Sequence, residues 1–579
     1  MILQALNSYY ERMVSEDSTA LAPFGFETKE LPFIIELNEQ GELIQIEDTR
    51  EGAGKKKQAR SFLVPKGVKK TSGVVANLLW DNAEYVLGID TKGKPERVQK
   101  QHQAFIKKIE SLPPEAKSDE GIQSVLGFFE QLDITQLETL PVWGELQTNP
   151  NLGFRLQGDT GLITSRVQVV KALEAQAEQA PDANALSSCL ITGDKRKIAR
   201  LHSAIKGVWG AQTSGANIVS FNLDAFDSYG KSRGENAPIG ERPAFAYTTA
   251  LNHLLRKNSP QRIQVGDAST VFWADKPTEL ETQIVDIFGE PSKDDPDRNT
   301  NAVKALFKAV DFGRYADDQG KTRFYILGLA PNAARISIRF QAVSTVVEVS
   351  RRIKCHFDDL SIEHSDKQLP YLPLFRLLAS TAVQGKADNI PPNLAGEVMR
   401  SILAETPYPQ TLLSAAVRRI RAEREISYPR AAIIKACINR KTRRSNPDIA
   451  EELKMSLDKG NTNTGYRLGR LFAVLEKTQE EANPGINATI RDRYYGAASS
   501  TPVSVFSTLL KLKNHHLSKI ENKGRVTNLE KLYGSIMDDI NDFPPVLSLE
   551  DQGRFAIGYY HQRQDFFKKR EVTDKGEQQ

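Results

Sequence analysis

Histidine, cysteine and carboxylate side chains are the first residues to consider, because they carry out most enzymatic acid–base, nucleophilic and metal chemistry. The chain has eight histidines, and none lies in a HExxH or HxH spacing typical of metal ligands. Its three cysteines, Cys189, Cys355 and Cys437, lie far apart and form no CxxC pair, which indicates neither a zinc site nor a disulfide framework. The sequence therefore predicts no metal site and no cofactor.

Two pairs of adjacent residues are weak candidates for catalysis. Cys355 and His356 form a Cys-His pair, but neighbouring side chains generally point apart and catalytic pairs are assembled from distant positions. Asp358 and Asp359 could bind a metal ion, but no second carboxylate cluster supports such a site. We therefore expect a solvated acidic turn there. The chain also lacks a GxxxxGK[ST] phosphate loop and a GxSxG nucleophile elbow. Nothing in the sequence demands an enzyme.

Basic residues are concentrated in particular segments, although the whole chain has a net charge of only +4. Residues 50–70 hold eight basic residues and one acid, a net charge of +7. Because positive side chains bind phosphates and release counterions, a DNA contact is the functional hypothesis, and a solvated lysine-rich loop is the alternative. The candidate DNA-binding residues of this segment are Lys55, Lys56, Lys57, Arg60, Lys66, Lys69 and Lys70.

Small polar residues follow this basic segment. Thr71 and Ser72 allow close approach to a DNA groove, and the amide of Asn77 can donate to or accept from base edges. We therefore add these three residues to the DNA-binding candidates, with Lys69 and Lys70 beside them as candidate readers of a short motif. The alternative is an ordinary turn that leads into a buried strand.

A second segment, residues 206–236, mixes polar residues and glycines with short apolar runs. This composition suits a loop that meets a nucleic-acid backbone, and the alternative is a set of tight turns that need glycine and asparagine. The candidate RNA- or DNA-binding residues are Lys206, Gln212, Lys231, Arg233 and Asn236.

A third segment, residues 418–444, holds ten basic residues and two acids, a net charge of +8. Arginine binds phosphate bidentately and stays charged, so this density indicates a track for nucleic acid. A solvated helix face is the alternative. The candidate DNA-binding residues are Arg418, Arg419, Arg421, Arg440, Arg443 and Arg444.

Apolar periodicity predicts the elements that position these residues. We expect an N-terminal helix, mostly helical structure over 110–190, and helices from about residue 370, the last of them opened by a capping box at 548–551. The predicted strands are 31–37 paired with 43–46, 218–221, 270–273, and 324–329 paired with 335–340. The fold class is therefore α+β, with a mixed α/β N-terminal region of short strands over 1–365 and an all-helical C-terminal bundle over 366–579.

The sequence also bears on location. No run of about 18 apolar residues occurs, so we expect no membrane-spanning helix and no membrane partner. The N-terminal residues lack a basic stretch followed by an apolar one, so we expect no signal peptide. Three scattered cysteines fit a reducing compartment, and the predicted location is the cytoplasm.

Several blocks spread along the chain carry a family resemblance. They are MILQAL at 1–6, IKGVWGAQ at 205–212, AFDSYG at 225–230, AYTTALN at 246–252, LAPNAAR at 329–335, YRLGRLF at 466–472 and GYYHQ at 558–562. In this order they resemble the large-subunit family of the type I-C CRISPR Cascade complex. The resemblance covers nearly the whole chain.

The resemblance implies a non-catalytic subunit of an RNA-guided DNA surveillance complex in antiviral defence. Its expected partners are a CRISPR guide RNA, double-stranded target DNA, the other Cascade backbone and small subunits, and a recruited helicase-nuclease that does the cutting. The large subunit is expected to recognise the motif that flanks the target, the protospacer-adjacent motif, and to aid duplex opening. The displaced strand is then the expected ligand of residues 418–444, since basic grooves hold single strands without reading sequence.

The resemblance has a further implication for the C-terminal part. In this family a small subunit can be translated from an internal start, and residues 455–579 resemble it, with Met455 as the candidate start. Two rival functions remain open: a metal-dependent nuclease with a site assembled from scattered His and Asp residues, and a generic RNA-binding assembly protein.

Overall fold

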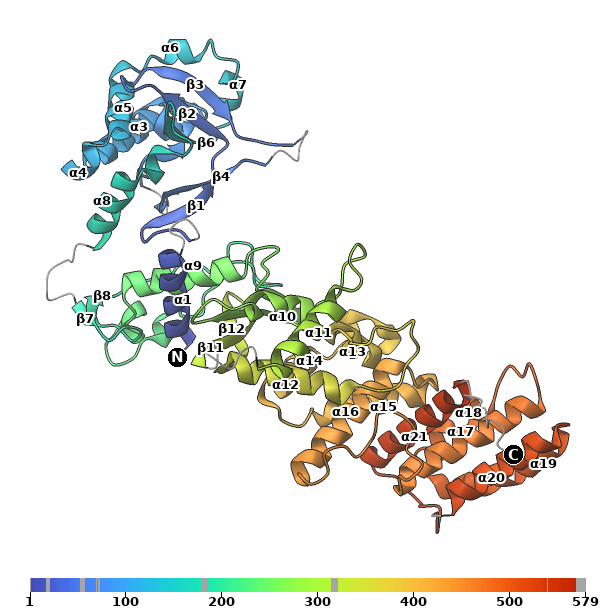
Figure 1. The fold of residues 1–579 in the computed structure, drawn as a ribbon. Coiled ribbons are helices and arrows are strands. Elements are labelled where there is room, and N and C mark those ends of the chain that lie inside the picture. Colours follow the sequence, from blue (N-terminus) through green and yellow to red (C-terminus); the bar gives the residue numbers. More distant parts are fainter. Residues whose placement is uncertain are drawn as a thin grey trace, which may run out of the picture. The chain divides into compact units, whose positions relative to one another are not determined.

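The computed structural model describes residues 2–16, 21–52, 58–68, 70, 73–178, 186–313, 321–538 and 540–568 (Figure 1). These residues divide between two compact units. The first unit comprises residues 1–203 and 219–253, and the second comprises residues 204–218 and 254–579. Short strands and helices mix in the first unit and at the start of the second, and the rest is helical, so the predicted α+β class is confirmed.

A four-stranded sheet organises the first unit. Its strand order is β3-β2-β6-β5, with β2 antiparallel to β3 and parallel to β6, and β5 antiparallel to β6. The strands are β2 (Phe33–Leu37), β3 (Leu43–Asp48), β5 (Trp80–Asn82) and β6 (Asn151–Leu156). The central strand β2 is apolar at nearly every position and buried on both faces, as expected for an interior strand. A separate antiparallel pair joins β1 (Phe26–Glu30) to β4 (Ser61–Pro65).

Two helices cover this sheet, α3 (Pro95–Glu110) and α5 (Glu120–Gln131) (Figure 1). Their packing centres on four aromatic rings, Phe105, Phe128, Phe129 and Phe154, whose centroids lie between 5.4 and 6.4 Å apart. Pro at the first position of α3 and two lysines in its last turn suit the helix termini. The aromatic core thus fixes α3 and with it the direction of its C-terminal lysines.

The first unit has further helices and two short strands. They are α1 (Ile2–Glu16), α2 (Ala83–Val86), α4 (Pro114–Lys117), α6 (Ile134–Leu137), α7 (Trp143–Leu146), α8 (Val167–Glu178), β7 (Leu186–Ser188), β8 (Lys195–Lys197) and α9 (Glu241–Leu254). Helix α1 packs on α9 through Tyr10, whose ring lies edge-on to Phe245 at 5.9 Å.

The second unit begins with an antiparallel sheet in the order β12-β11-β10-β9. The strands are β9 (Arg262–Val265), β10 (Ala268–Ala274), β11 (Arg323–Asn332) and β12 (Arg335–Thr345). Helices follow and surround it: α10 (Leu280–Phe288), α11 (Arg298–Asp311), α12 (Val346–Leu360), α13 (Leu374–Thr381), α14 (Pro392–Ala404), α15 (Gln410–Glu423) and α16 (Tyr428–Ser445). The last five are α17 (Thr464–Ala482), α18 (Ile490–Ala498), α19 (Phe506–Lys519), α20 (Lys523–Met537) and α21 (Leu549–Phe567).

One hydrophobic core runs through the second unit, from Val265 on the sheet to Tyr560 on the last helix. It crosses the predicted division at residue 365/366, which stays a prediction about functional regions. No helix among the described residues is long and apolar enough to cross a membrane.

Most predicted elements are confirmed, with two differences. The N-terminal helix, the hairpins β2/β3 and β11/β12, strand β10 and the capped last helix all form. The predicted strand at 218–221 is wrong: it pairs with no strand among the described residues, and the backbone bends at residues 218 and 219. Strand β6 lies within 110–190, where we expected helices, because it is held by β2 and β5 and not by its own sequence pattern.

Helices α17 and α21 approach each other through glycines. A methyl group at Gly469 would lie 1.9 Å from the carbonyl oxygen of Phe555, and one at Gly558 would lie 2.0 Å from that of Tyr466. Both distances are far below van der Waals contact. The backbones of the two helices can therefore pack this closely only with glycine at these positions.

Replacing one of these glycines should destabilise the second unit. We expect Gly469→Ala to lower the free energy of unfolding by about 2 kcal/mol or more, because the helices must separate to admit the methyl group. Gly496 of α18 also lies inside a helix, but a methyl group there would meet nothing within 4 Å. Gly496→Ala is the matched control, expected to leave stability unchanged or raise it by up to about 1 kcal/mol. Equal effects in chemical denaturation would contradict the close-packing argument.

Candidate nucleic-acid interface

A pocket of about 290 Å³ opens in the first unit beside the basic segment. Its polar lining is Lys66, Asn77, Lys108 and Ser111, and its apolar lining includes Phe26. Lys66 follows the last residue of β4, whereas Lys108 lies in the last turn of α3. Two lysines from distant parts of the chain thus meet at one pocket. Lys108 was not among the predicted site residues, and the only trace of it in the sequence is the adjacent pair Lys107-Lys108.

Two of the predicted motif-reading residues, Asn77 and Lys70, form contacts within the fold. Asn77 is buried, its side-chain oxygen accepts a hydrogen bond from the Val68 N–H at 2.9 Å, and its own N–H donates to Asp81 at 2.9 Å. Lys70 donates to both Asp81 oxygens at 2.5 and 2.6 Å and lies 3.6 Å from the ring centre of Tyr85. Asn77 therefore lines the pocket while bracing its wall, and the charge of Lys70 is neutralised.

The other basic residues of this segment differ in exposure. Lys66 is exposed and its ammonium donates to the Ser203 hydroxyl at 2.8 Å. Arg60 is exposed at the start of β4 and forms an ion pair with Glu47. The remaining candidates lie outside the described residues, so their role stays a prediction: Lys55, Lys56, Lys57, Lys69, Thr71 and Ser72.

The candidates of the second segment lie on irregular loops. Lys206 and Gln212 are exposed on residues 204–218 of the second unit. Lys231 and Arg233 are exposed on a loop of the first unit, and no acid among the described residues forms an ion pair with either. Asn236 is half-buried and holds this loop together from inside, since its amide donates to the carbonyls of Lys231 and Arg233, both at 3.1 Å.

The third segment divides into exposed and buried parts. On α15, Arg418 and Arg421 are exposed, whereas Arg419 pairs with Glu423 at 3.2 Å. The helix ends at Arg424, which lines an open groove of about 720 Å³ together with Arg493. The groove also contains Tyr494 and His516. Arg424 and Arg493 were not among the predicted site residues, because the groove forms where the end of α15 meets α17, α18 and α19.

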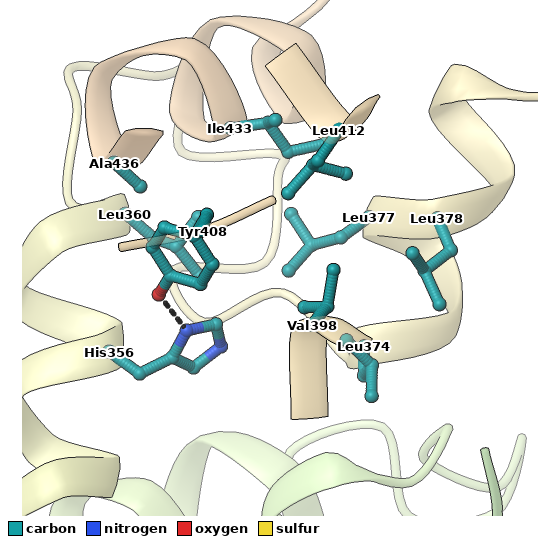
Figure 2. A pocket seen from close by; sticks show the side chains of 10 residues that line it. All are labelled: His356, Leu360, Leu374, Leu377, Leu378, Val398, Tyr408, Leu412, Ile433 and Ala436. Atoms are coloured by element: carbon teal, nitrogen blue, oxygen red, sulfur yellow. Dashed lines mark hydrogen bonds between the residues drawn. The ribbon is translucent and has the colours of Figure 1, made fainter. Parts of the chain in front are cut away.

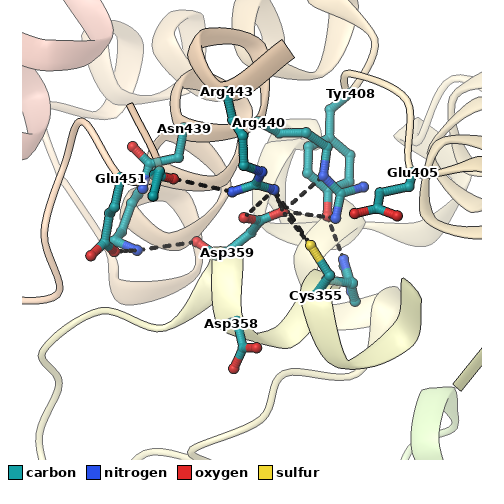
Figure 3. Close-up of polar contacts among 12 residues, drawn as sticks. Cys355, Asp358, Asp359, Glu405, Tyr408, Asn439, Arg440, Arg443 and Glu451 are labelled. Atoms are coloured by element: carbon teal, nitrogen blue, oxygen red, sulfur yellow. Dashed lines mark hydrogen bonds and ion pairs between the residues drawn. The ribbon is translucent and has the colours of Figure 1, made fainter. Parts of the chain in front are cut away.

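Arg440 of α16 is the candidate that the structure removes from the surface (Figure 3). Its side chain is 2% exposed, its Nε donates to Asp359 at 2.7 Å, and its guanidinium lies 4.2 Å from the ring centre of Tyr408. A side chain enclosed in this way does not reach a phosphate, so we leave it out of the proposed interface. Arg443 reaches the same carboxylate, with its Nη2 at 3.0 Å from Oδ1, and Arg444 is exposed in the last turn.

Asp358 and Asp359 do not form the expected solvated acidic turn. Both lie on helix α12, and Asp359 is buried as the shared acceptor of Arg440 and Arg443. Figure 3 shows Asp358 pointing away from this cluster, where it pairs with Lys354 at 3.1 Å. The sequence pattern did not distinguish the two because a buried carboxylate needs a partner far away in the chain.

Cys355 and His356 face different surroundings, as expected of neighbours. His356 donates to or accepts from the Tyr408 hydroxyl at 2.6 Å and lines a cavity of about 10 Å³ among leucine, isoleucine and valine side chains (Figure 2). Such a cavity has room for one water molecule at most. Burial, reinforced by the Asp359 carboxylate, raises the pKa of the Cys355 thiol. This pair therefore lacks the geometry of a nucleophile and its base.

No group of three or more His, Cys, Asp or Glu side chains that could hold a metal ion occurs in the described part of the chain. A family model described as CRISPR-associated protein (Cas_Csd1) matches residues 6–567. The chain belongs to the Cas_Csd1 family. The resemblance to the type I-C large subunit is thereby confirmed, and the chain is a CRISPR-associated protein. A search of curated proteins finds no match.

Only part of the predicted basic residues of this Csd1 chain is available at the surface. Of the predicted residues, the pocket of the first unit brings together Lys66 and Asn77 and adds Lys108. On the second unit, Arg418, Arg421 and Arg444 remain exposed, while Arg440 serves the core. Charge density along the sequence therefore overstates the charge available at the surface.

Removing the buried carboxylate of Asp359 should destabilise the helical core. We expect Asp359→Asn to lower the free energy of unfolding by about 3 to 5 kcal/mol, because it leaves the Arg440 charge buried without a counter-charge. The matched control is Asp358→Asn, whose side chain is 52% exposed and whose ion pair is expected to contribute at most about 1 kcal/mol. Chemical denaturation compares the two variants. Similar losses would show that Asp359 is not the anchor of this cluster.

The buried histidines should make the folded state less stable as the pH falls. Burial lowers the pKa of His561 to about 3 and that of His356 well below its usual range. The unfolded chain takes up protons below about pH 6.5 that these folded histidines reject, so stability present above that pH is lost as the pH falls. We expect His561 to account for about 2 kcal/mol of the stability lost between about pH 7.5 and pH 5, and His356 to act in the same direction. In denaturation at both pH values, His561→Gln should reduce this difference by that amount, and an unchanged difference would contradict the assignment.

Proposed function

We propose that the chain is the non-catalytic large subunit of a type I-C Cascade complex and recognises the protospacer-adjacent motif of double-stranded target DNA. The observation that carries the proposal is the pocket of the first unit, where Lys66 and Lys108 flank the buried amide of Asn77. Lysines bind phosphates whatever the sequence, whereas an amide beside them can respond to a base edge. Membership of the Cas_Csd1 family supports this assignment.

The second unit is proposed to hold single-stranded DNA. Arg418 and Arg421 are exposed on α15, and Arg424 continues the basic surface into the open groove that contains Arg493 and Tyr494. Cations with an aromatic ring suit a strand whose bases are unpaired. The displaced strand of an opened duplex is the proposed ligand, so this surface would aid opening by retaining that strand.

Family membership supports proposing the further parts of the role. We propose that the chain works in the cytoplasm with a guide RNA, with Cascade backbone and small subunits, and with a recruited helicase-nuclease that cuts the DNA. A product that starts at Met455 would contain α17 to α21 and lack α16, on which α21 packs through Ile434 and Ile438. Such a small subunit would need another surface to cover this side of α21.

The test is DNA binding by the complex reconstituted with its guide, on targets with the correct and with a scrambled flanking motif. We expect Lys66→Ala and Lys108→Ala to weaken binding to every target and to reduce the slope of log affinity against log salt by about 0.9 each. Asn77→Ala should lower the preference for the correct motif, because it removes the amide that can respond to a base edge. The preference is a ratio of two affinities, so a loss of folded protein does not change it.

Lys107→Ala is the matched control for Lys108→Ala. Lys107 is exposed on the same turn of α3 but does not line the pocket. We expect it to leave the affinity and the salt slope nearly unchanged. Equal effects of Lys107→Ala and Lys108→Ala, or a motif preference that survives Asn77→Ala, would contradict the proposed site.

A further inference from the structure

The loop of residues 227–236 in the first unit presents one large aromatic side chain to solvent. Tyr229 is 98% exposed, so its ring does not pack on the described part of the chain. Its backbone has a φ of 52°, in the left-handed region that residues with a side chain rarely adopt. An exposed aromatic residue in an unfavourable backbone conformation does not stabilise the folded state. Such outliers gather at binding sites, where the backbone conformation serves the ligand.

The loop holds Tyr229 in this position by a tight turn. Gly230 follows with a φ of 68°, and the Lys231 N–H donates to the Ser228 carbonyl at 3.0 Å, which closes a turn with Tyr229 and Gly230 at its tip. Two successive left-handed residues define a type I′ turn, which normally prefers asparagine or aspartate at the position of Tyr229. The tyrosine therefore stands where another residue would fold better.

The base of the turn is braced from both sides. Asn236 accepts from the Ser228 N–H at 3.0 Å and donates to Asp227 at 3.1 Å, so its amide spans the loop. Gly234 is buried against the neighbouring segment, where a methyl group would lie 2.1 Å from the Ala199 carbonyl oxygen. The tip is thus carried on a fixed base, and little conformational freedom remains to be lost when a ligand binds.

The charges of the loop divide in the same way. The acids are engaged within it: Asp227 accepts from the Arg233 N–H at 3.2 Å, and Glu235 accepts from the Ser232 N–H at 3.0 Å. The side chains of Lys231 and Arg233 are exposed without an ion pair to any described residue. An exposed ring beside two available cations matches the stacking and phosphate contacts that proteins make with single strands.

We propose that Tyr229 is a stacking platform for an unpaired nucleobase, with Lys231 and Arg233 positioned for the adjoining phosphates. The ligand class is single-stranded nucleic acid, and RNA and DNA strands are its two possible sources. This inference rests on the proposed nucleic-acid function but concerns a different surface from the pocket around Lys66 and Asn77. A protein partner would favour an apolar surround, whereas the neighbours of Tyr229 at the tip are a glycine and polar or charged residues.

The test measures binding of the full chain to a short labelled RNA strand and to the DNA strand of the same sequence, each also in an abasic form. We expect Tyr229→Ala to weaken binding to at least one base-containing strand by roughly fivefold to 150-fold, and Tyr229→Phe to stay within about twofold of the wild type. The abasic strands should bind wild type and Tyr229→Ala alike, because they offer phosphates without a base. Comparison of the RNA and DNA arms identifies the source of the base.

Tyr229→Asn separates binding from folding. Asparagine is favoured in the left-handed region, so we expect this variant to unfold at the same or a higher temperature while it loses affinity as Tyr229→Ala does. Phe312→Ala, which removes an 85% exposed ring from the second unit, is the matched control and should bind as the wild type does.

Two results would overturn the proposal. One is wild-type protein that binds base-containing and abasic strands equally. The other is Tyr229→Ala that binds single strands normally, and if that variant also failed to assemble with the other Cascade subunits, a protein partner would be indicated instead. Motif preference on duplex targets, measured with the same preparations, shows separately whether the proposed function stands.

Discussion

The close approach of α17 and α21 is the constraint on which the helical half of the chain depends. Glycines at 469 and 558 let backbone carbonyls of one helix sit against the Cα atoms of the other. Helix α21 then turns Gly553 towards Ile434 and Ile438 of α16. Helix α21 thereby packs on both α17 and α16, and α16 lies between α21 and α12.

Enclosing α16 has an electrostatic consequence. The helix is rich in basic residues, and those in its middle cannot face water, so the fold must supply counter-charges for them. Asp359 on α12 serves Arg440 and Arg443, and Glu451 lies 2.7 Å from the ammonium of Lys435. The exposed arginines lie at the ends of the basic segment, on α15 and in the last turn of α16. Packing thus decides which part of a charged sequence is left for a ligand.

The sequence predicts local elements better than it predicts their surroundings. The hairpins β2/β3 and β11/β12 have alternating or apolar strands around a turn, so both halves of the contact are encoded close together. Strand β6 and the wrongly predicted strand at 218–221 differ chiefly in whether a distant partner is present, and no local pattern shows that. Burial of Arg440 and exposure of Arg418 escape prediction for the same reason: the deciding neighbours lie on other helices.

Polar composition is a poor guide to contact residues because distant packing and loop bracing decide which polar groups stay available. Asn236 was predicted to meet nucleic acid because amides can bind bases, yet it uses both the oxygen and the nitrogen of its amide to brace a loop. The amide of Asn77 is engaged through its oxygen, which accepts from the Val68 N–H, and it still lines the pocket. A loop without regular hydrogen bonding must satisfy its backbone groups with nearby polar side chains. An amide such as that of Asn236 is then committed inside the loop, and a ligand is left with the side-chain groups that folding does not use. In the first unit these include the lysines at the pocket and, on the 227–236 loop, Tyr229 at the tip with the exposed Lys231 and Arg233 after it.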